Sequence, residues 1–138
     1  MSDTTVAKQS KGLNIALWVV QVLLAVAFGM AGSMKAFTPM DELAKKMPDL
    51  AAMGGLVRFI GFSELAGAIG LLLPALTRIL PILTPAAGVG LTVVMVLAVG
   101  SHVKAGDIGG SVPALVLGCL AAFVAWGRFR GAPITPRG

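Results

Sequence analysis

Charged residues are scarce in this 138-residue sequence: Asp, Glu, Lys and Arg make up 12% of it, whereas 57% of the residues are hydrophobic. A soluble domain carries about 25% charged residues. The shortage of charge and the mean hydropathy of +0.91 argue against a soluble globular domain, a disordered chain or a fibrous protein. An integral membrane protein remains, and at about 20 residues per crossing the length allows about four transmembrane helices.

Residues that commonly carry redox and metal chemistry are also scarce. The sequence has one cysteine, Cys119, one histidine, His102, and no tyrosine. This count excludes an intrachain disulfide, a CxxC pair, tyrosyl chemistry and haem ligation by two histidines of one protomer. No phosphate-binding glycine loop and no G-x-S-x-G motif is present. We therefore expect no metal site and no cofactor motif, and the sequence leaves the catalytic residues unknown.

The basic residues do not indicate a nucleic-acid partner. The chain has 11 Lys and Arg against 6 Asp and Glu, but the bases lie mainly at the ends of apolar runs, without a basic patch or interleaved aromatics. We interpret them as topology and headgroup anchors, so that the expected partner is the lipid bilayer.

Hydropathy divides the chain into three parts. Residues 1–12 are expected to be a flexible polar N-terminus, residues 13–127 a single transmembrane domain, and residues 128–138 a basic C-terminal tail. The predicted fold is an all-α antiparallel four-helix bundle in the membrane, with helices over about 13–34, 54–73, 79–101 and 108–127.

A short amphipathic helix is predicted between the first and second transmembrane helices. Thr38 is the expected N-cap, Pro39 the first helical residue, and Pro48 the stop signal. The apolar face of this helix consists of Met40, Leu43, Ala44 and Met47, and the other face carries the i,i+4 pairs Asp41/Lys45 and Glu42/Lys46. Such a helix lies in the membrane interface or caps the mouth of the bundle.

An even number of crossings places both termini on one side of the membrane. Six bases would face that side and five the other: Lys8, Lys11, Arg78, Arg128, Arg130 and Arg137 against Lys35, Lys45, Lys46, Arg58 and Lys104. This small difference favours cytoplasmic termini in an inner-membrane protein.

Small residues four apart predict close helix packing, because lipid supplies no hydrophobic drive between helices. The expected smooth faces are Ala25, Gly29 and Ser33; Ala66 and Gly70; Ala86 and Gly90; and Ala114, Gly118 and Ala122.

Glu64 is the leading candidate for function. Counting from Gly54, it lies about 15 Å into the membrane, near the bilayer centre. A carboxylate at that depth is expected to face the bundle interior and to find a partner. The topology also brings Lys35, Arg58, His102, Lys104 and Asp107 to one mouth of the bundle, with Glu64 below them.

Two interpretations of this mouth remain open. In the first, Glu64, His102, Lys35 and Arg58 bind a small ligand or handle protons. In the second, Glu64 holds the helices in register and the bases anchor the interface.

The segment RFIGFSELAGAIGLLLPALTRILPILTPAAGVGL, residues 58–91, resembles the DoxX-like family of small four-helix membrane proteins. The segment GSMKAF, His102 followed by Lys104 and Asp107, and the Gly-Arg pair at 127–128 are also similar to that family. The resemblance implies subunits linked to thiosulfate:quinone oxidoreduction and to membrane oxidoreductase complexes, and more distantly receptor chaperones or cargo receptors. Lys35, Glu64 and His102 match its polar positions.

Three hypotheses follow. The first is a subunit or accessory of a membrane oxidoreductase system, with a polar pocket around Glu64 that binds a small apolar molecule such as a quinone. The second is a non-enzymatic assembly factor, chaperone or structural subunit of a larger membrane complex, or a homo-oligomer. The third is a small transporter or proton path, which four helices without inverted repeats make less favourable in one protomer.

Overall fold

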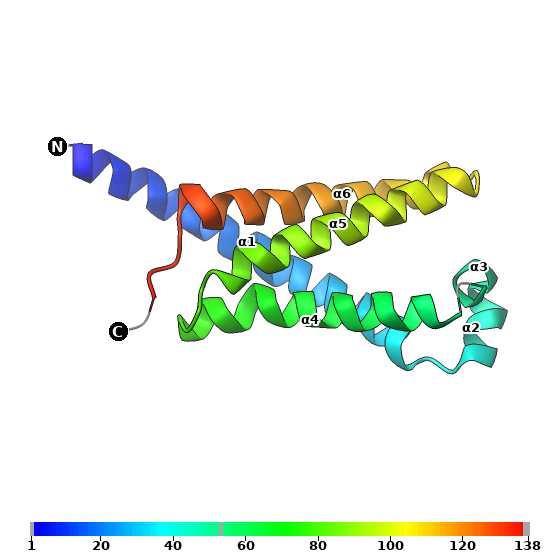
Figure 1. Ribbon diagram of the computed structural model, residues 1–138. Coiled ribbons are helices and arrows are strands. Elements are labelled where there is room, and N and C mark those ends of the chain that lie inside the picture. Colours follow the sequence, from blue (N-terminus) through cyan, green and yellow to red (C-terminus); the bar gives the residue numbers. More distant parts are fainter. Residues whose placement is uncertain (1, 53, 137–138) are drawn as a thin grey trace.

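Four long helices form the computed structural model, which describes residues 2–52 and 54–136 (Figure 1). They are α1 (Ser2–Phe37), α4 (Gly55–Thr77), α5 (Leu83–Lys104) and α6 (Ile108–Trp126). Their segments Lys11–Phe37, Gly55–Thr77, Leu83–Lys104 and Ile108–Gly131 are long and apolar enough to cross a membrane. The residues that the structure describes contain no β-strand, so the predicted all-α membrane fold is confirmed.

The helices alternate in direction, and α1 begins at the end of the bundle where the C-terminal segment leaves it (Figure 1). We call this the terminal end. The short helices α2 (Met40–Lys46) and α3 (Pro48–Ala51) lie at the other end, together with the turn between α5 and α6. We call this the loop end. Helix α1 packs along α4, α5 packs along α6, and α4 also packs against α5.

The two ends of the chain differ from the sequence-based boundaries. Helix α1 includes residues 2–12, for which a flexible segment is expected. No proline interrupts this stretch, and extension of an existing helix adds one hydrogen bond per residue. After α6, a π-helical turn, η1 (Gly127–Gly131), continues into the predicted tail.

Helix α2 has the predicted amphipathic character. Leu43 is buried, whereas Asp41, Glu42, Lys45 and Lys46 are exposed. The predicted cap at Thr38 is wrong: Pro39 occupies the N-cap in a non-helical conformation and provides no side-chain cap. Met47 is extended because the ring of the following proline disfavours helical backbone, which ends α2 at Lys46.

Helix α4 continues through Pro74 to Thr77, although the proline is expected to end it near residue 73. Proline lacks an N–H group, so the carbonyl of Gly70 loses its usual helical donor. The hydroxyl of Thr84 donates a hydrogen bond to this carbonyl at 3.1 Å. The amide Nε2 of Gln21 likewise donates to the next carbonyl, that of Leu71, at 2.6 Å. Side chains of α5 and α1 thus satisfy polar backbone groups near the proline, which lipid could not do.

Glycines at positions other than the predicted rows bring α1 and α4 together. A Cβ atom at Gly32 would lie 2.8 Å from the carbonyl oxygen of Gly61, and one at Gly61 would lie 2.5 Å from the amide nitrogen of Ala36. In contrast, a Cβ atom at Gly29 or Gly90 would meet no other atom within 4 Å. Of the predicted rows, Ser33, Ala66, Ala86 and Ala122 are exposed, whereas Ala25, Ala114 and Gly118 are buried and a Cβ atom at Gly70 would lie 2.8 Å from the Cβ of Ala87.

The substitution Gly32→Ala is therefore expected to destabilise the protein by about 1–3 kcal/mol, because the added methyl group would overlap the backbone of α4. Gly29→Ala is the matched control on the same helix and should change little or add stability. Thermal unfolding in detergent measures both. Equal melting temperatures for the two variants would contradict the close contact.

Candidate functional site

A salt bridge joins α1 and α4 near the loop end. Lys35, in the last turn of α1, places its Nζ atom 2.6 Å from Oε1 of Glu64. The Glu64 side chain is 1% exposed and that of Lys35 is 18% exposed. Burial makes removal of one partner costly, since the remaining charge would lie uncompensated in a low-dielectric interior.

The close glycine contact is part of this site. Each partner of the salt bridge follows a glycine by three residues, Lys35 after Gly32 and Glu64 after Gly61. A Cβ atom at Gly61 would lie 2.8 Å from the carbonyl carbon of Lys35, and one at Gly32 would lie 3.1 Å from the Cβ of Glu64. The absence of side chains at both positions lets the backbones approach until the lysine reaches the carboxylate.

Arg58 contributes to the site without contacting Glu64. Its Nη1 atom donates a hydrogen bond of 3.2 Å to the carbonyl oxygen of Lys35. This carbonyl belongs to the last turn of α1, where backbone acceptors lack helical partners. A cation at a helix C-terminus also interacts favourably with the helix dipole. Arg58 therefore caps α1 and holds the backbone of Lys35 in place.

One oxygen of Glu64 lacks a partner. Its Oε2 atom is buried and accepts no hydrogen bond from the described residues. Buried polar atoms are usually paired, so this carboxylate oxygen keeps an unused capacity to accept a hydrogen bond.

His102 and Asp107 form a separate pair in the turn between α5 and α6. Nδ1 of His102 lies 3.1 Å from Oδ2 of Asp107. The other carboxylate oxygen of Asp107 accepts a hydrogen bond of 2.9 Å from the amide of Gly110 and so caps α6. The Gly110 amide, and after it His102, hold the pKa of this carboxyl below its ordinary value of 3.8. The structure thus brings Lys35, Arg58 and Glu64 together and gives His102 a different partner.

A second polar cluster surrounds Arg128, which the sequence places in the tail as an interface anchor. Arg128 is instead 3% exposed. Its Nε atom donates to Oε1 of Gln21 at 2.6 Å, and its Nη1 atom donates to Oδ1 of Asn14 at 2.6 Å and to the carbonyl of Ala132 at 2.8 Å. The guanidinium also lies over the ring of Trp18, 5.5 Å from its centroid.

The π-helical turn explains why Arg128 faces inward. The amide of Ala132 donates to the carbonyl of Gly127, five residues earlier, at 2.7 Å. This wider turn shifts the direction of the side chains relative to α6. Gly127 and Gly131 lie against Leu17 and Leu13 of α1, so α1 reaches η1 closely enough for the hydrogen bonds.

The sequence contains a spacing of polar residues on α1 from which this cluster could have been predicted. Asn14, Gln21 and Lys35 follow one another at multiples of seven residues, with Phe28 in the remaining position. A seven-residue repeat keeps side chains on one face of a helix. Polar residues on a shared face of an apolar helix predict polar partners on the facing elements. The described partners are Arg128, the Leu71 carbonyl and Glu64.

The chain belongs to the DoxX-like family: the model of that family matches residues 19–124. No curated protein and no solved structure matches the chain significantly. The match includes Lys35, Arg58, Glu64 and His102, and it ends before Arg128.

Lys35→Met is expected to lower the free energy of unfolding by about 3 kcal/mol, because Glu64 stays buried without its cation. The double variant Lys35→Met/Glu64→Gln should recover most of the loss, since no buried charge then remains at this site. A double-mutant cycle of unfolding free energies in mixed micelles measures the coupling. Lys104→Met, which removes an exposed lysine, is the control. A Lys35→Met protein as stable as the control would contradict a buried ion pair.

The depressed pKa of Asp107 predicts a pH dependence. A carboxyl group whose pKa is lower in the folded state stabilises that state above its ordinary pKa, and the contribution disappears as the pH falls through the lowered value. Asp107→Asn keeps a capping oxygen but cannot titrate. The stability difference between wild type and Asp107→Asn should therefore be constant above pH 5 or so and shrink as the pH falls below about 4. Melting temperatures across this range test it, and a difference that grows on acidification would contradict it.

Proposed function

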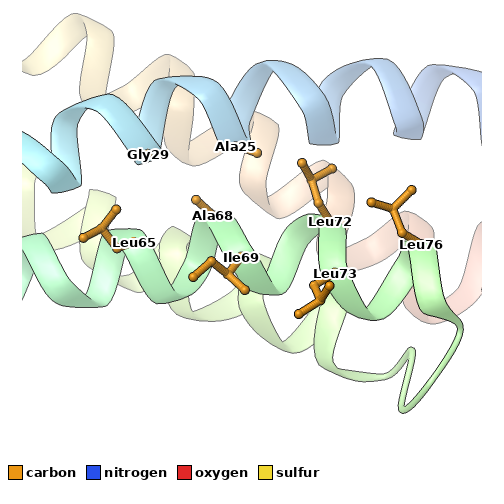
Figure 2. A pocket seen from close by; sticks show the side chains of 8 residues that line it. All are labelled: Ala25, Gly29, Leu65, Ala68, Ile69, Leu72, Leu73 and Leu76. Atoms are coloured by element: carbon orange, nitrogen blue, oxygen red, sulfur yellow. The ribbon is translucent and has the colours of Figure 1, made fainter.

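We propose that this member of the DoxX-like family is an accessory subunit of a membrane oxidoreductase system that binds a quinone-like molecule between α1 and α4. The observation that carries the proposal is an apolar groove of about 390 Å³ between α1 and α4, which begins at Leu65, the residue after Glu64 (Figure 2). Its lining consists of Ala25, Gly29, Leu65, Ala68, Ile69, Leu72, Leu73 and Leu76.

The groove suits the apolar part of such a ligand. Figure 2 shows leucine and isoleucine side chains of α4 along it, and Gly29 of α1 leaves open space. The groove faces outward between two helices, so a ligand could enter it from lipid. Binding pockets are typically apolar with a few polar groups that fix orientation.

The salt bridge would supply those polar groups. Leu65 of the groove directly follows Glu64, and Gly29 precedes Lys35 by about 9 Å of helix. Neither residue lines the groove itself, so the ligand headgroup would have to pass Leu65 to bring a quinol hydroxyl to the unpaired Oε2 of Glu64 or a quinone carbonyl to Lys35. The pair thus offers a partner to either redox form of the ligand.

The proposal assigns electron transfer to a partner subunit. One cysteine and one histidine give the chain no redox pair of its own. The role derived for its residues is to hold the ligand and to accept a proton at Glu64. In this proposal the protein lies in the inner membrane with cytoplasmic termini.

One observation favours the alternative, a non-enzymatic assembly or structural subunit. Phe37 and Phe62 pack edge to face with ring centroids 5.6 Å apart, yet they are 65% and 51% exposed, and Phe59 is 68% exposed. Aromatic side chains are enriched at the centres of protein interfaces. This aromatic cluster on α1 and α4 could receive a helix of a larger complex or of a second copy.

Quinone content after gentle extraction tests the proposal. The wild-type protein, reconstituted with ubiquinone or menaquinone, should retain quinone on native mass spectrometry. Gly29→Leu fills the groove and should abolish retention, whereas Gly90→Leu, a matched substitution in open space on α5, should not change it. Glu64→Gln should weaken binding about tenfold, through loss of a hydrogen bond to a charged acceptor.

Absence of quinone from the wild-type protein, or equal retention in Gly29→Leu and Gly90→Leu, would contradict the binding site. A larger partner without quinone would instead favour the alternative.

A further inference from the structure

A second hollow lies at the terminal end, beyond Leu76, the last α4 residue of the groove between α1 and α4. Its volume is about 530 Å³, and its wall includes Lys11, Asn14 and Trp18 of α1, Arg78 after α4, and Ala132 and Thr135 of the C-terminal segment. Lys11 begins one membrane-spanning segment and Arg78 directly follows another. The hollow therefore lies at the depth where lipid headgroups meet the hydrocarbon core.

A buried positive charge stands behind this wall. Asn14, Trp18 and Ala132 line the hollow, and the same three residues contact the guanidinium of Arg128. All the described partners of Arg128 are neutral, and its Nη2 atom is buried without a hydrogen bond. The positive charge of Arg128 thus lies directly behind residues that line the hollow. No described carboxylate compensates this charge.

Four of the six acidic residues have side chains that the structure describes, and these four lie elsewhere. Glu64 pairs with Lys35, Asp107 pairs with His102, and α2 carries Asp41 and Glu42 at the loop end. The hollow instead combines two exposed cations, Lys11 and Arg78, with the buried one. Clefts lined by one sign of charge concentrate ions of the opposite sign.

We propose that this hollow binds the phosphate of an anionic phospholipid headgroup. Lys11 and Arg78 would contact the phosphate, because a guanidinium matches two of its oxygens and an ammonium adds a point charge. The Thr135 hydroxyl is a further donor in the wall. Arg128 acts from behind as a positioning residue through its field and through Asn14.

The surroundings favour a lipid over a soluble phosphate. Leu76 and Ile79 flank Arg78 along the chain and are 67% and 58% exposed, so that acyl chains can lie beside the site. Trp18, a residue type that accumulates at membrane interfaces, is part of the wall. Basic pockets between transmembrane helices are known to hold lipid headgroups of this chemistry. The proposal does not rest on the quinone-binding proposal, because the hollow shares no lining residue with the groove, although Leu76 of the groove is near Arg78.

Lipid titration of the full-length protein tests the assignment. Native mass spectrometry would compare phosphatidylglycerol, zwitterionic phosphatidylcholine and soluble glycerol phosphate. The wild-type protein should prefer phosphatidylglycerol. The double variant Lys11→Gln/Arg78→Gln should bind phosphatidylglycerol about thirtyfold more weakly. It lacks two cations, and each of them strengthens the attraction to an anionic lipid by a similar factor.

The double variant Lys104→Gln/Arg130→Gln is the control, because it removes the same charge from exposed positions outside the hollow. It should keep the wild-type preference, and circular dichroism verifies that both doubles are folded. Equal weakening in the two doubles, or no preference for phosphatidylglycerol in the wild type, would overturn the site. Competition by glycerol phosphate at the same concentration as the lipid would overturn its assignment to a lipid.

Discussion

The salt bridge between Lys35 and Glu64 determines how the first half of this membrane protein is assembled. Lipid does not drive apolar helices together, so close packing and polar contacts must define their arrangement. Gly32 and Gly61 let α1 and α4 approach, and at that separation Lys35 reaches Glu64. Arg58 then caps α1 at Lys35. Steric fit and charge thus specify the same crossing of α1 and α4. The apolar groove lies between these two helices.

Helix α1 organises both ends of the bundle. Its polar face bonds to α4 through Lys35 and Gln21 and to η1 through Gln21 and Asn14. The loop end therefore holds a paired charge with one free carboxylate oxygen, whereas the terminal end holds a buried cation, Arg128, with no counter-charge among the described side chains. This difference is the basis for the two proposed ligands, a neutral quinone-like molecule in the groove next to Glu64 and an anionic headgroup near Arg128.

Hydropathy and charge were sufficient to predict the four helices and to select Glu64 and Lys35, because a charge in an apolar segment requires a partner. They identified Gly70 and Gly118, which lie against α5, but not Gly32 and Gly61 at the contact of α1 with α4. Small residues occur on several faces of each helix, and neighbouring positions differ by about 100° around the axis. Pro74 was expected to end its helix. However, the hydroxyl of Thr84, on the next long helix, donates to the Gly70 carbonyl in place of the N–H group that proline lacks. Arg128 faces inward from a π-helical turn, which no local sequence pattern predicts.

The protonation state of Glu64 tests the central claim most directly. Infrared spectroscopy of the ligand-free protein would compare the carboxylic acid C=O band of the wild type with that of Glu64→Gln. The ion pair predicts no difference in this band, because an ionised carboxylate does not contribute to it, and predicts that the band gains intensity in Lys35→Met. A protonated-carboxyl band that is present in the wild type and lost in Glu64→Gln would contradict the account.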